Sequence, residues 1–290
     1  MTVRALAGAA LLAAGAALAA ADPSSSLVGG IGRHTATKGE TLQLIGARYG
    51  VDVATVTADN DLTARSAIRI GQVLVIDNRH VVPDSVEEES IVVNVPQRML
   101  FYRSGGRTLG FPVAVGSSGW RTPLRPFTVV AKETDPTWDV PESIAAEARA
   151  KGKPLPRAIP PGPSNPLGRH WLGLSVGVIG IHGTNAPGSI FRAGTHGCIR
   201  VHPDDIARLF DLVAVGTPGR FVYEPVLVAQ DGNDVFLEVH ADVYRRSAVN
   251  AMDQAIAQAG ELGLTDRIDW VRAAAVVSAR HGVARVVTQR

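Results

Sequence analysis

Short apolar runs separated by turn residues restrict the fold of this chain more than any other feature of its sequence. The runs are rich in β-branched and aromatic residues, and Gly, Ser and Pro lie between them. They occupy residues 91–95, 99–102, 109–115 and 127–131. The Ser104-Gly105-Gly106 step between two of them predicts a hairpin. This spacing favours a mainly β fold, a β-sandwich or barrel, over a parallel sheet with crossover helices.

A proline-rich segment at residues 134–168 interrupts this β pattern and contains one short helical candidate at 142–151. Loops of this length inside a compact domain are usually lids or binding loops. Strand-like runs resume at 171–174 and 178–181, and a closing strand is expected at 220–223. We therefore expect the segment to lie beside a functional site.

The first 21 residues have the pattern of a secretory signal peptide. Arg4 forms a short basic region, residues 5–18 are an apolar core, and Ala19-Ala20-Ala21 supplies small residues for cleavage. The apolar core is shorter than the roughly 20 residues that a membrane-spanning helix needs. We therefore expect an exported protein with no transmembrane segment after cleavage.

Charge and cysteine content narrow the function classes. The chain has 29 Lys and Arg against 27 Asp and Glu, which gives no strongly basic face and excludes nucleic acid as an expected partner. Cys198 is the single cysteine of the 290 residues, so an internal disulfide is impossible. Because an unpaired structural thiol would be a liability in an oxidising compartment, we expect Cys198 to have a chemical role.

The cysteine lies in one of two short motifs that are typical of nucleophilic catalysis. Thr-His-Gly-Cys-Ile-Arg occupies residues 195–200, and His-Gly-Thr occupies 182–184 at the expected end of a strand. A thiolate attacks an amide more readily than a thiol does, so a base must remove the proton of Cys198. We expect His182 to be that base, because the intrinsic pKa of histidine lies near neutrality. Gly183 is expected to orient its ring through the backbone.

Other residues of the two motifs are expected to bind the intermediate or the substrate. The backbone N–H groups of His196, Gly197 and Cys198 are expected to form an oxyanion hole, in which each donor is typically worth about 2.7 to 4 kcal/mol. The His196 side chain could itself donate to the intermediate, or it could be packed and fix the loop. Thr184 and Thr195 are expected to contribute to substrate binding.

Arg200 is a candidate for holding a substrate carboxylate, because a guanidinium can pair with one bidentately. A structural salt bridge to Asp204 or Asp205 is the alternative. These aspartates begin a predicted helix, with Asp204 as its expected N-cap. His202 is expected to be a turn residue.

A zinc site is a rival interpretation, since His182, His196, Cys198 and His202 are four potential ligands. One residue separates His196 from Cys198, which is tighter than the usual spacing of paired zinc ligands. A zinc-bound thiolate would also be unavailable for attack. We therefore expect neither a metal nor an organic cofactor.

Residues 33–78 are expected to form a compact unit of strand, two helices and strand. The unit resembles the LysM module in its Gly-Glu-Thr-Leu, Tyr-Gly, Asn-x-Leu and Ile-x-x-Gly-Gln-x-Leu-x-Ile patterns. This resemblance implies a βααβ fold that binds the N-acetylglucosamine-containing glycan strands of peptidoglycan. Thr41, Asn60 and Gln72 could contact sugar, or they could cap and turn the small domain.

The two motifs around His182 and Cys198 together resemble the L,D-transpeptidase catalytic domain of the YkuD type. Supporting matches include Thr122-Pro123, Thr137-Trp138 and Asn165-Pro166-Leu167-Gly168, and they resemble the ErfK/YbiS-like branch common in Gram-negative envelopes. The chain departs from the family in having Leu124-Arg125-Pro126 where a glycine usually follows Thr-Pro, and Thr195 where serine is commoner.

The resemblance implies that Cys198 attacks the third residue of a donor tetrapeptide stem, a meso-diaminopimelate, and expels D-alanine to leave a thioester. An amine of another stem would then give a 3-3 cross-link, a lysine of an envelope protein would give an anchored protein, and water would make the chain an L,D-carboxypeptidase. Carbapenem-type β-lactams are expected to acylate the same thiol. The implied location is the periplasm, in association with the cell wall. A non-catalytic, LysM-containing wall-binding protein is the alternative.

The domain organisation expected from these patterns has five parts. They are a signal peptide at 1–21, a LysM domain at 33–78, a solvated linker at 79–90, a catalytic domain at 91–224 and a C-terminal α+β extension at 225–290. The extension is predicted to contain a hairpin around Asp231-Gly232-Asn233-Asp234 and two helices, at 244–260 and 265–281. The LysM and catalytic domains are expected to be independent units.

Overall fold

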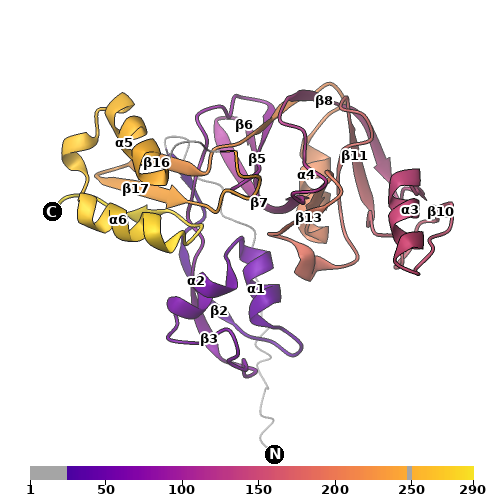
Figure 1. The fold of residues 1–290 in the computed structure, drawn as a ribbon, viewed down its shortest axis with the longest axis horizontal. Coiled ribbons are helices and arrows are strands. Elements are labelled where there is room, and N and C mark those ends of the chain that lie inside the picture. The colour runs from indigo at the N-terminus through magenta and orange to yellow at the C-terminus, as the bar shows by residue number, and fades with distance from the viewer. Residues whose placement is uncertain (1–24, 247–249) are drawn as a thin grey trace, which may run out of the picture.

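The computed structural model describes residues 25–246 and 250–290 (Figure 1). The predicted signal peptide lies outside these described residues. Across both described ranges, no helix is long and apolar enough to span a bilayer.

The predicted LysM unit is the lower part of Figure 1 and has the order strand, helix, helix, strand. Its strands β2 (Ile31–Thr35) and β3 (Val73–Asp77) pair antiparallel, and α1 (Leu42–Tyr49) and α2 (Val53–Ala58) lie between them in sequence. The apolar residues of the helices and of β3 form one buried cluster. This cluster also contains Val283 from the C-terminal extension, so the unit does not close on itself alone.

The three polar residues that could have contacted sugar have structural partners in this unit. The Thr41 side chain accepts a hydrogen bond from the N–H of Leu44 and caps α1. The Asn60 side chain bonds both backbone groups of Val75, and the Gln72 side chain accepts from the N–H of Arg69. These contacts favour the cap-and-turn interpretation.

A large sheet that closes on itself forms the centre of the molecule and confirms the mainly β class. Its members are β5 (Ser90–Asn94), β6 (Met99–Ser104), β7 (Arg107–Gly116), β8 (Pro126–Thr134), β11 (His170–Leu174), β12 (Gly180–His182), β13 (Ala193–Thr195), β14 (Ile199–Val201) and β15 (Pro218–Val222). The order runs β13-β7-β14-β12-β11-β8-β15-β5-β6, and β6 pairs again with β7. Closure is possible because β7 is long: Arg107 to Pro112 pair with β6, and Val113 onward pairs with β14 and β13.

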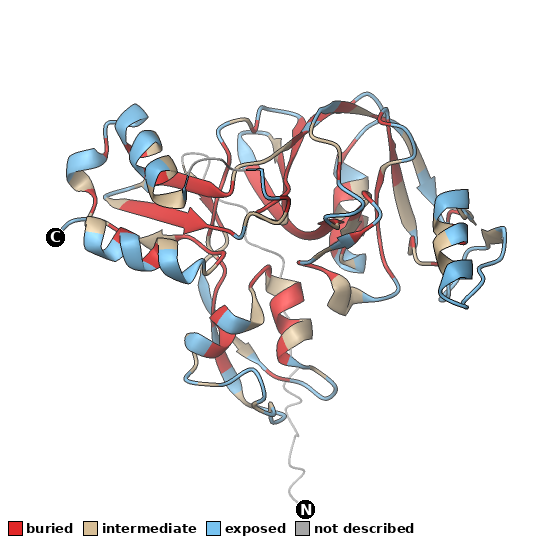
Figure 2. Ribbon diagram, viewed as in Figure 1, coloured by how far each residue is buried: buried red, intermediate tan, exposed pale blue. Residues whose placement is uncertain are grey.

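The interior of this sheet is filled by apolar side chains that Figure 2 shows as buried. One end carries α4 (Pro203–Leu212), which contributes Ile206 and Leu209 to the same core. The N-cap of α4 is His202, whose Nδ1 accepts from the N–H of Asp204. The prediction that Asp204 caps this helix is wrong: the cap lies two residues earlier, at His202, the helix begins at Pro203, and Asp204 lies in its first turn.

The proline-rich segment projects from one end of the sheet, at the right of Figure 1. It contains β9 (Trp138–Asp139) paired with β10 (Ala158–Ile159), and α3 (Glu142–Ala150) between them. Ala145 is the one buried residue of α3. The buried Asn165 ties the segment together, since its amide donates to the carbonyl oxygens of Pro136 and Ile159.

The C-terminal extension forms a second, smaller α+β layer. The hairpin consists of β16 (Val226–Asp231) and β17 (Asp234–Val239), and β18 (Arg285–Val286) adds a strand that the sequence did not predict. Helices α5 (Ala251–Glu261) and α6 (Trp270–Ala279) cover it. Both begin several residues later than predicted, after the side-chain caps Asn250 and Asp269.

The prediction of a solvated linker at 79–90 is wrong. Strand β4 (His80–Val81) pairs with β1 (Leu27–Val28), and Val82 and Val86 are also buried. The acidic residues at 87–89 are exposed, as their charge requires, but the apolar residues before them fill the space between three parts of the fold. The acidic residues at 87–89 led to the prediction of a linker, which overlooked the buried valines at 81, 82 and 86.

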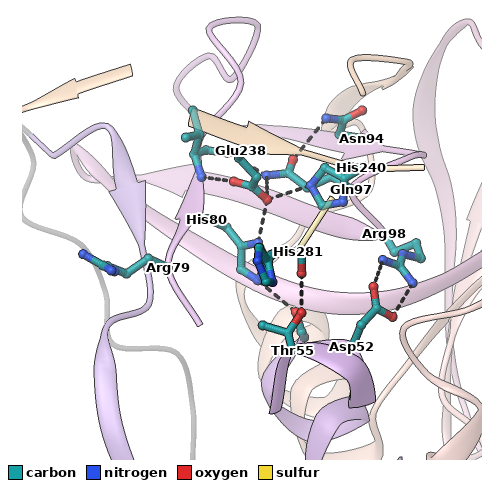
Figure 3. Close-up of polar contacts among 12 residues, drawn as sticks. Asp52, Thr55, Arg79, His80, Asn94, Gln97, Arg98, Glu238, His240 and His281 are labelled. Carbon is teal, nitrogen blue, oxygen red and sulfur yellow. Dashed lines mark hydrogen bonds and ion pairs between the residues drawn. The ribbon is translucent and has the colours of Figure 1, made fainter. Parts of the chain in front are cut away.

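A buried carboxylate joins those three parts (Figure 3). Glu238 of β17 is fully buried and accepts hydrogen bonds from the N–H of Val81 at 2.6 Å and from the side chains of His80, Gln97 and His240 at 2.8, 3.1 and 2.7 Å. The second ring nitrogen of His80 lies 3.1 Å from the carbonyl oxygen of Gly50, so both nitrogens of this buried ring have a partner. Burial alone would raise the pKa of Glu238, but the charge of His80 and these hydrogen bonds lower it to about 2.

Further contacts join the LysM helices to the rest of the chain. Asp52 makes a bidentate ion pair with Arg98 at 2.8 to 3.0 Å, and the Thr55 hydroxyl donates to the carbonyl oxygen of His281 at 2.7 Å (Figure 3). Arg48 of α1 lies 3.3 Å from a carboxylate oxygen of Asp205 in α4. The LysM unit, which was expected to be independent of the catalytic domain, is therefore joined to the rest of the chain by hydrogen bonds and ion pairs.

We expect Glu238→Gln to lower the free energy of unfolding by about 3 to 5 kcal/mol, because it removes one partner of the buried Glu238–His80 pair and an oxygen acceptor from the surrounding donors. Urea denaturation measures this loss. The control is Glu87→Gln, which breaks the exposed ion pair with Arg220 and should cost less than about 1 kcal/mol.

The low pKa of Glu238 also predicts the direction of acid unfolding. A carboxyl group whose pKa is lower in the folded state stabilises it above the unfolded pKa, near 4.5, and loses this contribution as the pH falls toward about 2. The wild-type chain should therefore lose stability more steeply than Glu238→Gln over this range. Parallel pH curves for the two proteins would contradict the assignment.

Candidate active site

A cavity of about 560 Å³ lies where the proline-rich segment meets β12 and β14. Four of the predicted polar site residues, His182, His196, Cys198 and Arg200, line it together. The rest of the lining is mostly aromatic, aliphatic and proline side chains, including Trp138, Trp171, Pro136, Pro141, Ile144 and Pro166. A cavity of this size and character is typical of a site for a small or extended ligand.

Strand register explains why the histidine and the cysteine meet. Strands β12 and β14 pair in parallel, with Ile181 opposite Ile199 and His182 opposite Arg200. Side chains alternate between the two faces of a strand, and both isoleucines are fully buried in the core. His182 and Arg200 therefore lie on the opposite face, and Cys198, directly before β14, joins them there.

His182 is buried, and its surroundings keep it neutral. Its Nδ1 donates to the carbonyl oxygen of Gly183 at 2.7 Å, in the tautomer that leaves Nε2 as an acceptor. Burial and then the charge of Arg200 lower the pKa of His182 to about 4, against the opposing effect of the Gly183 and Leu167 carbonyls. At neutral pH the ring is an uncharged base.

Trp171 holds the His182 ring from one side. The two rings stack with centroids 5.8 Å apart and planes inclined by 26°. Gly180 makes this possible, because a Cβ at that position would lie 2.2 Å from the Trp171 ring. The sequence predicted only that Trp171 begins a strand-like run, and no local pattern indicates that its ring packs on His182.

Cys198 is half-buried and carries a protonated thiol. Its Sγ donates to the carbonyl oxygen of Val178 at 3.7 Å. Burial raises the pKa of the Cys198 thiol, and the Gly180 backbone N–H and the Arg200 charge only partly oppose this. Cys198 and His182 are therefore both uncharged at neutral pH.

The loop before Cys198 is fixed by hydroxyl groups. Thr195 donates to the carbonyl oxygen of Cys198 at 2.6 Å and accepts from the N–H of Gly197 at 3.1 Å. Thr122 donates to the carbonyl oxygen of Gly197 at 2.9 Å. The Gly197 N–H is therefore engaged within the loop, which argues against its predicted place in an oxyanion hole. Thr195, although it lines the cavity, shapes the loop through its hydroxyl.

Arg200 does not form the salt bridge considered as its alternative role. Asp204 and Asp205 lie 3.7 and 3.3 Å from Arg48 instead. Arg200 donates from Nη1 to the neutral hydroxyl of Ser189 at 2.9 Å, and its buried Nε has no hydrogen-bond partner among the described residues. A half-buried cation on the cavity wall thus keeps capacity for an acidic ligand.

His196 is exposed and contacts the projecting segment across the cavity. Its Nε2 lies 2.9 Å from a carboxylate oxygen of Glu147 in α3, and its ring lies 5.0 Å from that of Trp120. Hydrogen bonds from Lys151 and His196 lower the pKa of Glu147 to about 2. Of the two roles considered for the His196 side chain, this arrangement favours loop fixation. Glu147 was missed because a helix prediction alone does not tell which residue of the helix faces His196.

Thr184, which was expected to bind substrate, and His202, which was considered as a ligand of the rival zinc site, do not line the cavity. The Thr184 hydroxyl accepts from the N–H of Ala186 at 3.0 Å, so it shapes the turn after His182. His202 faces Arg48 at 2.9 Å. Throughout residues 25–246 and 250–290, no three His, Cys, Asp or Glu side chains are grouped to hold a metal, so the rival zinc set is not assembled.

Comparison with known proteins identifies two families in the chain. Residues 88–228 match the L,D-transpeptidase catalytic domain, named YkuD, and residues 34–77 match the LysM domain. Among curated proteins, the chain is 34% identical over 221 residues to the probable L,D-transpeptidase YbiS of Escherichia coli K12, covering 74% of this chain and 72% of that protein. It is also 34% identical over 222 residues to the probable L,D-transpeptidase ErfK/SrfK of Salmonella typhimurium, covering 75% and 71%.

Among solved structures, the chain is similar to L,D-transpeptidase 3 of Mycobacterium tuberculosis, with a TM-score of 0.37, 14% identity and coverage of 54% of this chain and 76% of that chain. The identity to the curated relatives extends over most of both proteins and includes the segment that carries His182 and Cys198. The chain therefore belongs to the L,D-transpeptidase family and combines a YkuD catalytic domain with a LysM domain.

Proposed function

We propose that the chain is a cysteine L,D-transpeptidase of peptidoglycan in which Cys198 is the nucleophile and His182 the base. The observation that carries the proposal is the position of a half-buried thiol and a buried, neutral imidazole on the wall of one cavity. Nucleophile and base within one site, with the base oriented by a third group, is the arrangement of covalent acyl-transfer catalysis. The Gly183 carbonyl is that third group.

In the acylation step, the Cys198 proton moves to Nε2 of His182 while Sγ attacks the carbonyl carbon of the third residue of a donor stem, a meso-diaminopimelate. The carbon–sulfur bond forms, and the oxyanion then collapses with cleavage of the peptide bond to D-alanine. The imidazolium returns its proton to the leaving amine. A thioester on Cys198 and free D-alanine remain, and the proton balance of the site is unchanged.

In the second step, an amine of the acceptor attacks the thioester and gives up a proton to His182, which passes it to the departing sulfur. A stem amine yields a 3-3 cross-link, and a lysine of an envelope protein yields an anchored protein. Water in the same position would give L,D-carboxypeptidase activity. The neutral resting pair suits this cycle, because charge separates only while a substrate excludes water from the cavity.

Substrate positioning is assigned to the cavity walls. Arg200 would pair with a stem carboxylate, for which its unpartnered Nε is available. The proline-rich segment and the contact between Glu147 and His196 would close over an extended peptide. The LysM domain would hold the enzyme on glycan strands in the periplasm, which raises the local concentration of stems.

We expect incubation with a carbapenem to add one drug mass to the wild-type chain and none to Cys198→Ala. The reason is that the drug would acylate the same thiol as the stem peptide. Intact-protein mass spectrometry measures the adduct. An adduct of equal yield on the variant would refute the nucleophile assignment.

We expect His182→Ala to slow acylation by about 100- to 10,000-fold, the usual contribution of a general base. His196→Ala is the control, since its ring contacts Glu147 and Trp120 and should have a much smaller effect. Stopped-flow fluorescence of drug binding gives both rates. A large loss of acylation rate in His196→Ala, together with a normal rate in His182→Ala, would show that His196 is the base and His182 is not.

The pH profile of acylation tests the state of the base. Because the base works as a neutral ring with a pKa of about 4, the rate should stay nearly level from pH 7 to about pH 5 and fall below about pH 4. Circular dichroism at each pH checks that the chain remains folded. An acid limb at pH 6 to 7 would show that the environment of His182 does not lower its pKa.

The reaction itself is tested with purified muropeptides that contain tetrapeptide stems. Mass spectrometry should detect released D-alanine together with a 3-3 linked dimer. Tripeptide products without dimer would indicate the carboxypeptidase activity, and unchanged muropeptides would refute the proposal.

A further inference from the structure

Tyr244 lies outside the segment that matches the catalytic family, yet its ring belongs to the catalytic core. It follows β17 by five residues and is 2% exposed, packed in the same cluster as the core of the closed sheet. Its backbone N–H donates to the hydroxyl of Tyr223 at 2.8 Å, and the two rings stack with centroids 5.5 Å apart. The extension therefore inserts one side chain into the catalytic domain.

The hydroxyl of Tyr244 bridges the two ends of the loop that contains Trp120. It donates to the carbonyl oxygen of Gly116 at 2.8 Å and accepts from the N–H of Thr122 at 3.0 Å. The loop folds so closely against Gly116 that a Cβ there would lie 2.2 Å from the Trp120 carbonyl oxygen. Because the loop is packed this closely against Gly116, we expect its geometry to depend on the hydrogen bonds of the Tyr244 hydroxyl to Gly116 and Thr122.

Thr122 carries this arrangement to the nucleophile. Its hydroxyl accepts from the N–H of Gly116 at 2.9 Å, which leaves its proton for the carbonyl oxygen of Gly197, also at 2.9 Å. The peptide between Gly197 and Cys198 is planar and trans, so its C=O and N–H point in opposite directions. Holding the Gly197 oxygen toward Thr122 therefore turns the Cys198 N–H away from Thr122.

We propose that Tyr244 is a positioning residue for the reaction: through Thr122 it orients the peptide whose N–H, that of Cys198, stabilises the oxyanion. The inference rests on the proposed function, in which Cys198 is acylated. It gives the C-terminal extension a role in chemistry, since this part of the chain supplies a side chain without which the nucleophile loop lacks its fixed partner. Gly197 cannot replace the donor, because its N–H is bound by Thr195.

The test separates oxyanion stabilisation from thiol reactivity in the full chain. Acylation by a carbapenem passes through a tetrahedral oxyanion, whereas alkylation by iodoacetamide does not. We expect Tyr244→Phe to slow acylation roughly 10- to 100-fold, less than the roughly 100- to 1,000-fold loss on deleting an oxyanion donor. Alkylation should stay within about twofold of the wild-type rate.

Tyr102→Phe is the matched control. Tyr102 is equally buried in the same core, and its hydroxyl donates to Glu89 at 2.7 Å, far along the chain from the nucleophile loop. The substitution should lower the melting temperature and leave the ratio of acylation to alkylation unchanged. A merely structural role of Tyr244 would give this same pattern.

Thr122 supplies a second pair of variants in case Tyr244→Phe folds poorly. Thr122→Val keeps the shape and should reproduce the selective loss of acylation, and Thr122→Ser should restore it. An unchanged ratio in Tyr244→Phe, or in Thr122→Val if the former does not fold, overturns the inference alone. A wild-type chain that is alkylated but never acylated at Cys198 overturns the proposed function and this inference with it.

Discussion

The parallel pairing of β12 with β14 is the constraint on which the site depends. One register sets two isoleucines into the core and, by alternation, puts His182 and Arg200 on the other face beside Cys198. A slip of one residue would bury the polar pair and expose the isoleucines, so the hydrophobic core itself enforces the geometry of the site. Stability and chemistry are thus specified by the same strands.

Burial acts on the two reactive groups in opposite directions and leaves both uncharged. Burial lowers the pKa of His182 and raises that of Cys198. The positive charge of Arg200 lowers both pKa values, which disfavours the imidazolium and favours the thiolate. The site therefore differs from one that holds a permanent thiolate and imidazolium pair. In the proposed mechanism, proton transfer is therefore coupled to the attack of Cys198, and a neutral thiol is oxidised less readily than a thiolate.

The sequence alone predicted those features that have local signals. Alternating apolar runs and turn residues indicated the β domain, and the two motifs supplied His182 and Cys198, which line one cavity. Three of the contacts that were missed join residues more than a hundred positions apart: Thr122 with Tyr244, Arg48 with Asp205, and His80 with Glu238. The residues that neighbour either member of such a pair in the sequence carry no signal of the other member. For the same reason, the residues around His80 read as a linker although they lie at the junction of three parts of the fold.

Strand β15 and the C-terminal extension, which come late in the sequence, also limit the order in which the chain can fold. Strand β5 pairs with β15, which lies more than a hundred residues further along the chain. His80 likewise cannot form its hydrogen bond until Glu238 is present. Such non-local contacts make folding slow and dependent on a nearly complete chain. A chain released before residue 244 would contain every motif of the catalytic family and still lack the hydroxyl that bridges Gly116 and Thr122. The Cys198 thiol would therefore acquire its ordered surroundings only once residue 244 is available for folding.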